Sequence, residues 1–207
     1  ISWLEIGCGA GYFLNALGDK GIKNILGIDE NELLINVANS HSSKKIAKVT
    51  KDLFKELPNL NYDIICAFFV LEHIEDSYEL WSILSKMKKG TIFVFSVPTF
   101  SFTTMMECGL NNFAARNLDN VVHTQLYTDE SIDFALNMSG YEKKAEWLFG
   151  QDSQDLCEFI ARQLKHHTDE KMFKTISKSL SSLIDPLQNT IDKMRLCDAR
   201  HVLAIKS

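Results

Sequence analysis

The stretch WLEIGCGAGYFLNAL, from Trp3 to Leu17, decides the fold of this chain of 207 residues. It begins with a short apolar run that contains Glu5. Glycines then alternate with other residues, and apolar residues with helical spacing follow from Phe13 and Leu14 onward. Glycine lets backbone N–H groups approach a ligand closely, and a helix N-terminus adds positive electrostatic potential. The stretch is therefore typical of a strand, a ligand-binding loop and a helix.

Apolar runs and helical patterns alternate along the chain as far as Pro98. Strands separated by helices of this length are typical of βαβ units, whose strands form a parallel sheet with right-handed crossovers. Ligands of such doubly wound sheets bind at the carboxyl ends of the strands. The predicted strands are residues 2–7, 24–29, 45–52, 62–70 and 91–98, and the predicted helices are residues 11–21, 30–40 and 76–90.

The regular alternation ends after Pro98. Residues 99–127 are polar, rich in asparagine and predicted to be irregular, and a loop this long inside a compact domain is usually functional or mobile. The elements predicted beyond it are a helix over residues 128–140, a strand over 141–150, helices within 153–196 that break near 166–169 and at Pro186, and a last strand over 201–207.

The composition is that of an ordinary globular protein, with 45% hydrophobic and 24% charged residues. A net charge of −5 gives no basic footprint, so we expect neither a nucleic acid nor an anionic membrane as a main partner. The longest apolar run, residues 64–71, is far shorter than the ~20 residues of a membrane-spanning helix, so we also expect no membrane span.

The five cysteines indicate the cellular compartment. Because their number is odd and no two of them have C-x-x-C spacing, we expect reduced thiols and a cytoplasmic location. A catalytic role for Cys8 or Cys108 stays open. No secretory signal precedes the first strand, which begins directly after Ile1. We therefore expect the domain to be truncated at its N-terminus.

The residues beside the glycines narrow the choice of ligand. The dinucleotide fingerprint G-x-G-x-x-G requires a small residue three positions after Gly9, where this chain has the bulky Tyr12. Glu5 stands two residues before Gly7, and a carboxylate in that place would repel a pyrophosphate and attract a cation. These residues favour a cationic ligand over a nicotinamide dinucleotide.

The segment EIGCGAG, Glu5 to Gly11, resembles motif I of class I S-adenosylmethionine-dependent methyltransferases. The resemblance extends in order along the chain as far as Gly150, in the branch that includes the ubiquinone and menaquinone methyltransferases. The further matching positions are Asp29, Asp52 and the segments YDIICAFFVLEHIED (62–76), MKKGTIFVFSVP (87–98) and HTQLYTDESIDFALNMSGYE (123–142).

The resemblance implies an α/β fold with a Rossmann-like, doubly wound sheet of seven strands, mostly parallel, whose last strand is antiparallel. We expect residues 1–207 to form a single methyltransferase domain. Family members usually join the last two strands by a short hairpin, whereas residues 153–196 form a helical insertion at that point. Covering the active site and forming a homodimer are the two roles that we favour for these helices.

The resemblance also implies a site for S-adenosylmethionine. Because no cysteine lies beside a histidine at metal-ligand spacing, we expect no metal site. Asp29 occupies the position of the acid that holds the ribose hydroxyls, and Asp52 that of the acid facing the adenine amino group. Two simpler roles stay open: Glu5 could bind neighbouring amides, and Asp52 could cap a helix. The predicted cofactor-binding residues are Glu5, Gly7, Cys8, Gly9, Gly11, Tyr12, Phe13, Asp29, Glu30, Asp52, Leu53, Phe68 and Phe69.

The implied reaction is methyl transfer from S-adenosylmethionine to a small-molecule or metabolite acceptor, with oxygen, nitrogen and carbon all open as the accepting atom. Such a displacement needs a base only when the acceptor must lose a proton. His73 and His123 are the candidate catalytic residues, because histidine titrates near neutral pH. A structural role for each histidine stays open. The alternative that this chain is a non-catalytic member of the same fold, which binds a cofactor or a partner, also stays open.

Overall fold

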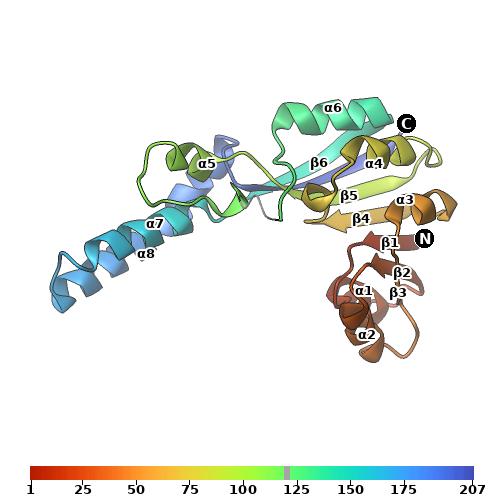
Figure 1. Ribbon diagram of the computed structural model, residues 1–207, viewed down its shortest axis with the longest axis horizontal. Helices are drawn as coiled ribbons and strands as arrows, with labels where there is room; N and C mark the ends of the chain where they lie inside the picture. Colours follow the sequence, from red (N-terminus) through yellow and green to blue (C-terminus); the bar gives the residue numbers. More distant parts are fainter. Residues whose placement is uncertain (119–121) are drawn as a thin grey trace. The chain divides into compact units, whose positions relative to one another are not determined.

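The computed structural model describes residues 1–118 and 122–207 (Figure 1). A seven-stranded sheet runs in the order β3-β2-β1-β4-β5-β7-β6. The first five strands are parallel to their neighbours and the last is antiparallel, which confirms the predicted Rossmann-like architecture. The strands are β1 Ser2–Ile6, β2 Asn24–Asp29, β3 Ala47–Val49, β4 Ile64–Phe68, β5 Ile92–Pro98, β6 Tyr141–Phe149 and β7 Ala199–Lys206.

The chain divides into two compact units. The first, here called the sheet unit, comprises Ile1–Val97, Asp129–Glu146 and His201–Ser207, and the second, the helical unit, comprises Pro98–Thr128 and Trp147–Arg200. Helices of the sheet unit are α1 Tyr12–Asp19, α2 Glu32–Ser40, α3 Leu53–Glu56, α4 Ser77–Leu84 and α6 Asp129–Ser139; those of the helical unit are α5 Phe102–Glu107, α7 Asp152–Leu164 and α8 Glu170–Lys193. The expected single domain over residues 1–207 and the insertion at 153–196 stay predictions.

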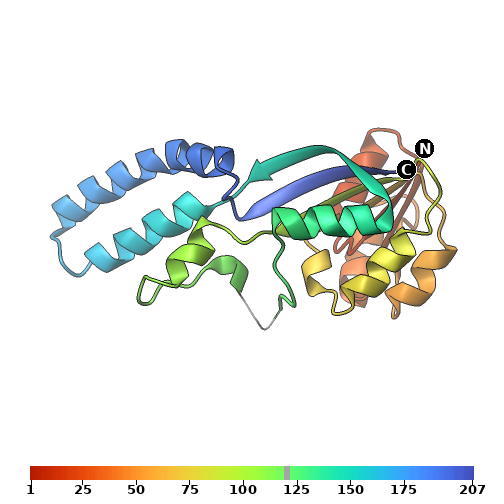
Figure 2. The same ribbon diagram turned by 90° about the horizontal axis from the view of Figure 1, so that it is seen from above.

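Helices cover both faces of the sheet in the sheet unit. The register pairs Phe68 of β4 with Ser96 of β5, so these two residues share one face and Phe95 points to the other. Phe13 of α1 packs edge-on against Phe68, whereas Trp81 of α4 packs edge-on against Phe95. Helices α1 and α4 therefore lie on opposite faces, and α6 lies beside α4 in Figures 1 and 2.

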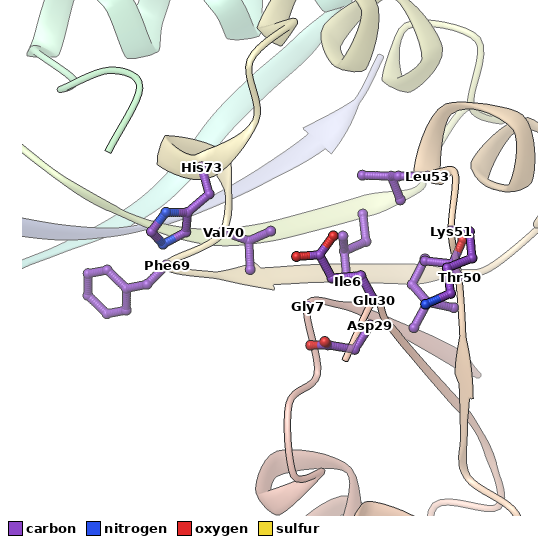
Figure 3. Close-up of a pocket in the computed structure, with 11 residues that line it drawn as sticks. Ile6, Gly7, Asp29, Glu30, Thr50, Lys51, Leu53, Phe69, Val70 and His73 are labelled. Carbon is purple, nitrogen blue, oxygen red and sulfur yellow. The ribbon is translucent and has the colours of Figure 1, made fainter. Parts of the chain in front are cut away.

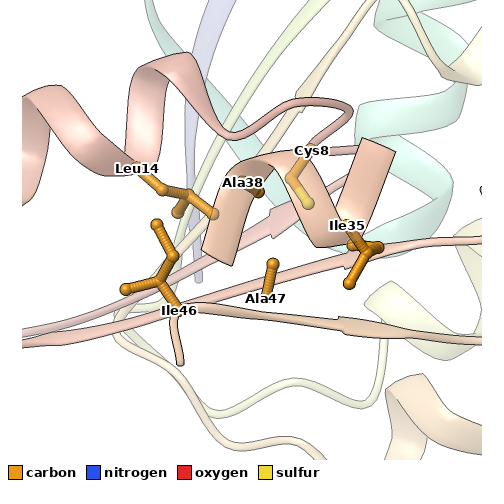
Figure 4. Packing of buried hydrophobic residues seen from close by; sticks show 6 residues of the cluster. All are labelled: Cys8, Leu14, Ile35, Ala38, Ile46 and Ala47. Carbon is orange, nitrogen blue, oxygen red and sulfur yellow. The ribbon is translucent and has the colours of Figure 1, made fainter. Parts of the chain in front are cut away.

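A small apolar cluster fixes the start of the glycine loop. Gly27 of β2 lies directly beneath Cys8 and Leu14, because a Cβ atom at this position would come within 2.4 Å of Leu14 and 2.5 Å of the Cys8 sulfur. The absence of a side chain on β2 thus lets the loop and α1 pack closely on the sheet. The buried members of the cluster, drawn in Figure 4, are Cys8, Leu14, Ile35, Ala38, Ile46 and Ala47.

In the sequence, Asp76 with Glu79 three residues later predicts a cap at the start of the helix over residues 76–90. The structure confirms it, since the Asp76 side chain accepts a hydrogen bond from the Glu79 N–H at 2.8 Å at the start of α4. The predicted break at Pro186 is wrong, because Pro186 lies inside α8. Proline deprives the carbonyl four residues earlier of its donor. That residue is Ser182, which is exposed, so water can reach its carbonyl. Helix α8 also packs along α7 (Figure 2), and this contact favours its continuation.

The segment 99–127 is less irregular than predicted, because it contains the short helix α5. Ser101 and Thr104 form a reciprocal capping box at the start of α5. Residues 119–121 of the same segment lie outside the described residues. Across residues 1–118 and 122–207, no helix has the length and hydrophobicity required to cross a membrane.

Candidate cofactor site

A cavity of about 380 Å³ opens at the carboxyl ends of β1 to β4 in the sheet unit. This is the edge at which doubly wound sheets bind their ligands. Figure 3 shows His73 and Phe69 on one side of the cavity, Thr50 and Lys51 on the other, and the Asp29 carboxylate between them. The lining residues are Ile6, Gly7, Ile28, Asp29, Glu30, Thr50, Lys51, Leu53, Phe69, Val70 and His73.

Six of the predicted site residues line this cavity, and they are Gly7, Asp29, Glu30, Leu53, Phe69 and His73. Five further lining residues were missed: Ile6, Ile28, Thr50, Lys51 and Val70. Each missed residue lies at or just beyond the carboxyl end of a strand, next to or within two residues of a predicted one. The predicted strand ends were therefore sufficient to indicate these five residues, because residues at the carboxyl end of a parallel strand lie at the edge of the sheet where ligands bind.

The three glycines of the loop have different surroundings. A Cβ atom at Gly7 would come within 2.4 Å of Val70, and one at Gly11 within 2.6 Å of Ala38. At Gly9 a Cβ atom would meet nothing within 4 Å, although its φ of +50° favours glycine. Gly7 and Gly11 are therefore required for packing inside the protein. At Gly9, by contrast, the space that a side chain would take is unoccupied.

Asp29 fastens the glycine loop to the end of β2. Its Oδ2 accepts a hydrogen bond from the Gly9 N–H at 2.8 Å, and its Oδ1 accepts one from the Asn31 N–H at 2.9 Å. Asn31 in turn caps α2 by accepting from Leu33 and Leu34. Because each carboxylate oxygen has about two acceptor positions, both oxygens of Asp29 retain capacity for a hydroxyl group.

Glu5 is a buried acid next to the carboxyl end of β1, with only 6% of its surface exposed. Its Oε2 has no hydrogen-bond partner among the residues that the structure describes, so it does not hold a neighbouring amide. Burial and, to a smaller extent, repulsion by Asp29 raise the pKa of Glu5 to about 8. An unpaired buried carboxyl group is costly, and such groups concentrate at functional sites.

Asp52 has the helix-capping role that the sequence left open. Its Oδ1 accepts from the Lys55 N–H at 3.1 Å at the start of α3, and its Oδ2 pairs with the Lys55 ammonium at 2.6 Å. The hydrogen bonds to Lys55 lower the pKa of Asp52. Leu53, the next residue, lines the cavity, whereas Asp52 is not among its lining residues.

Eight of the predicted cofactor-binding residues are not among the lining residues, and they are Glu5, Cys8, Gly9, Gly11, Tyr12, Phe13, Asp52 and Phe68. Tyr12 is 82% exposed at the start of α1. Phe13 packs edge-on between Trp3, at 5.9 Å between ring centroids, and Phe68, at 5.1 Å. Cys8 is buried, and burial together with the acids Glu5 and Asp29 raises the pKa of its thiol to about 12, which disfavours a nucleophilic role.

The two candidate catalytic histidines lie in different units. His73 belongs to the sheet unit and lines the cavity, with its Nε2 3.9 Å from a carboxylate oxygen of the buried Glu72. His123 belongs to the helical unit, where its Nδ1 lies 3.1 Å from the Asn117 carbonyl oxygen. Their catalytic roles stay predictions.

A family model described as a methyltransferase domain matches residues 1–146. The chain belongs to this family of methyltransferase domains, which confirms the family predicted from its motifs. A structure with a similar fold is the SAM-dependent methyltransferase of Archaeoglobus fulgidus, with a TM-score of 0.62 and 23% identity over 99% of this chain and 86% of the other.

Two curated proteins match part of this chain, and each is much longer than the segment that matches. The first, "Probable S-adenosylmethionine-dependent methyltransferase" of Mycolicibacterium smegmatis, is 26% identical over 125 residues, which are 59% of this chain and 48% of the relative. The second is the mitochondrial ubiquinone biosynthesis O-methyltransferase of Dictyostelium discoideum, 24% identical over 113 residues, 47% of this chain and 35% of the relative. The chain thus spans half or less of the curated relatives that it matches.

Proposed function

We propose that this chain transfers a methyl group from S-adenosylmethionine to a small-molecule acceptor. The observation that carries the proposal is the combination of the cavity at the strand ends, the open Gly9 and the unpaired buried acid Glu5. S-adenosylmethionine is a cation with two ribose hydroxyls, and it is the cofactor named for the relative from Mycolicibacterium smegmatis. Oxygen, nitrogen and carbon remain candidates for the accepting atom.

Residues that line the cavity, together with Glu5 and Asp52 next to lining residues in the sequence, fit this cofactor. The unpaired Oε2 of Glu5 provides negative charge for a cationic group, and binding would favour the ionised form of this acid. The free acceptor capacity of Asp29 suits the ribose hydroxyls, with charge-assisted hydrogen bonds worth roughly 1.5–3 kcal/mol each. Leu53 provides an apolar surface for the adenine. If Asp52 binds the adenine amino group, it does so while its carboxylate also accepts the hydrogen bond that caps α3.

S-adenosylmethionine supplies an electrophilic methyl group on a sulfonium. The protein's contribution to such a displacement is to align the acceptor and to exclude water. Phe69, Val70 and His73 form the side of the cavity contributed by the segment after β4. We assign this side to the acceptor.

Turnover separates this proposal from a non-catalytic member of the same fold. S-adenosylmethionine labelled in its methyl group is incubated with the protein and a metabolite extract, and label in small molecules is counted. We expect label to accumulate with the wild type and not with Gly9→Ala, which blocks the open part of the loop. Cofactor binding without any transfer to the extract would instead favour a binding module.

The wider assignments are also proposals. The spacing of the five cysteines supports a cytoplasmic location, and the net charge of −5 supports a small molecule rather than a nucleic acid as partner. Exposed apolar residues on and just after α8, namely Met172, Leu183 and Met194, support a homodimer through the C-terminal helices. Sedimentation of the wild type and of Leu183→Asp tests this, since a dimer through α8 should dissociate in the variant.

A further inference from the structure

A lysine lines the cavity just beyond the end of β3 in the sheet unit. Lys51 lies on the side of the cavity opposite His73 and Phe69 (Figure 3). The residue is exposed, and its side chain forms no hydrogen bond or ion pair within residues 1–118 and 122–207. The three donors of its ammonium group are therefore available to a ligand.

The backbone on both sides of Lys51 is held in place. The Thr50 N–H donates a hydrogen bond of 2.9 Å to the carbonyl oxygen of Asp29, which continues the pairing of β2 with β3. On the other side, the Asp52 side chain caps α3. Lys51 therefore has a fixed backbone position next to the end of β2, and only its side chain has freedom to adapt to a ligand.

The strand order determines which part of the cofactor Lys51 can reach. The cavity spans the carboxyl ends of β3, β2, β1 and β4, in that spatial order. Neighbouring strands lie about 4.8 Å apart, so the end of β3 is roughly 10 Å from the glycine loop after β1 and roughly 14 Å from the segment after β4. With the ribose at Asp29 of β2 and the acceptor at the β4 side, the adenine lies at the β3 side, together with Lys51 and Leu53.

The charges of the cofactor also favour the adenine as the partner of Lys51. The sulfonium of S-adenosylmethionine is a cation, and an ammonium group close to it would oppose binding. The carboxylate of the cofactor belongs to its methionine part, which the sulfonium separates from the ribose and the base. A lysine at the β3 side is thus distant from both of these charged groups.

Adenine offers suitable acceptors for a lysine. Its ring nitrogens N1, N3 and N7 accept hydrogen bonds, whereas its amino group is a donor that an ammonium group cannot bind. A hydrogen bond from a charged donor is stronger than one between neutral groups. A base that lacks the matching acceptor leaves the lysine unpaired in the occupied cavity, and this difference gives selectivity between bases.

We propose that the ammonium group of Lys51 donates a hydrogen bond to a ring nitrogen of the adenine and so helps to select the base of the cofactor. This inference rests on the proposed binding of S-adenosylmethionine in the cavity. Lys51 then contributes to cofactor binding and not to the methyl-transfer step. Its loss should raise the KM for S-adenosylmethionine and leave kcat unchanged.

Deaza analogues of S-adenosylhomocysteine test the contact one atom at a time. In the 1-deaza, 3-deaza and 7-deaza analogues, a C–H group replaces one ring nitrogen. Calorimetry of the wild type should show that one of these analogues binds about tenfold more weakly than the parent compound, because a hydrogen bond to a charged group is lost.

The variant Lys51→Met completes this comparison. Methionine retains most of the length of the lysine stem but has no donor. The variant should bind the parent compound about tenfold more weakly than the wild type does, and it should lose nothing further with the same analogue. The matched control is Lys45→Met, which changes an exposed lysine before the start of β3 and should bind every compound as the wild type does.

Binding of 5′-methylthioadenosine distinguishes the adenine from the carboxylate as the partner of Lys51. This compound retains the adenine and the ribose but lacks the amino acid part of the cofactor. Lys51→Met should weaken its binding by the same factor as it weakens that of S-adenosylhomocysteine. Unchanged binding of 5′-methylthioadenosine would assign Lys51 to the carboxylate and would overturn the inference.

The remaining outcomes separate this inference from the proposed function. A wild type that does not bind S-adenosylhomocysteine would overturn the proposed function. Binding by the wild type that Lys51→Met leaves unchanged would overturn only the inference. So would deaza analogues that each weaken binding to the wild type and to Lys51→Met by equal factors, because the lysine would then not contact any ring nitrogen.

Discussion

At the scale of single residues, the three glycines of the loop differ in what surrounds them. Gly7 and Gly11 are small because Val70 and Ala38 pack against them, and Gly9 alone adjoins open space. Asp29 joins the loop to β2 through the Gly9 N–H and still has acceptor capacity for a ligand. Glu5 is the reverse case, a buried acid whose Oε2 has no partner among the described residues. We propose that the cationic cofactor provides the partner that Glu5 lacks.

Removal of the Asp29 carboxylate should weaken cofactor binding. Asp29→Ala loses the acceptor for the ribose hydroxyls and also the hydrogen bond that holds the Gly9 N–H. We expect the affinity for S-adenosylhomocysteine to fall tenfold or more, in line with charge-assisted hydrogen bonds of roughly 1.5–3 kcal/mol. Calorimetry of this variant is compared with Asp19→Ala, which changes an exposed acid at the end of α1 and should bind as the wild type does.

Glu5 should make the stability of the cofactor-free protein depend on pH. The pKa of Glu5 is about 8 in the folded state, compared with 4.5 for an exposed glutamate. The folded state therefore holds the proton more tightly, and stability falls as pH rises between these two values. The steepest fall is about 1.4 kcal/mol per pH unit.

Urea unfolding at pH 5 and pH 8 measures this effect. Glu5→Gln cannot ionise, so its free energy of unfolding should change less than that of the wild type between the two pH values. Equal changes in the two proteins would show that the buried acid does not titrate in this range.

At the scale of elements, the sequence predicted those strands, helices and turns that short-range patterns determine. The strands up to Pro98, the cap at Asp76 and the glycine loop follow from periodicity and turn chemistry. Helix α8 continues through Pro186 because it packs on α7, a tertiary contact that the local sequence does not carry. Likewise the strand order places Ser96 beside His201, which no spacing could indicate.

The loop glycines should separate stability from binding. Gly7→Ala forces a Cβ atom against Val70 and should destabilise the fold, which would appear as a lower melting temperature. Gly9→Ala has room for its methyl group and costs only about 1–2 kcal/mol through its left-handed backbone. We expect it to remain folded and to lose binding of S-adenosylhomocysteine. Tight binding by folded Gly9→Ala would mean that the ligand does not approach this part of the loop.

At the scale of the whole molecule, the two units are held internally by different means. The buried acid Glu5 of the sheet unit has an Oε2 without a partner among the described residues, whereas the buried acids Asp152 and Asp198 of the helical unit join its segments by hydrogen bonds. Asp152 accepts hydrogen bonds from the N–H and hydroxyl of Thr103 and from the Asp198 N–H. Arg116 forms an ion pair with Asp198. Burial and the neighbouring Asp152 raise the pKa of Asp198 to about 6, and Arg116 opposes this rise.

Loss of Arg116 should destabilise the helical unit. Arg116→Ala leaves Asp198 buried beside Asp152 without its cation, and we expect a loss of a few kcal/mol, because a buried charge without its partner is costly. Adding Asp198→Asn in the double variant should recover part of the loss. The free energies of unfolding of the wild type, the two single variants and the double variant are measured in urea at pH 7 from the circular dichroism of the helices. Additive effects of the two substitutions would show that Arg116 and Asp198 are not coupled.

Calorimetry with S-adenosylhomocysteine and NAD⁺ on the wild-type chain tests the central claim most directly. The account predicts micromolar binding of S-adenosylhomocysteine that is weakened tenfold or more by Asp29→Ala, and no measurable binding of NAD⁺. Micromolar binding of NAD⁺ with none of S-adenosylhomocysteine would contradict it, and so would binding of S-adenosylhomocysteine that Asp29→Ala leaves unchanged.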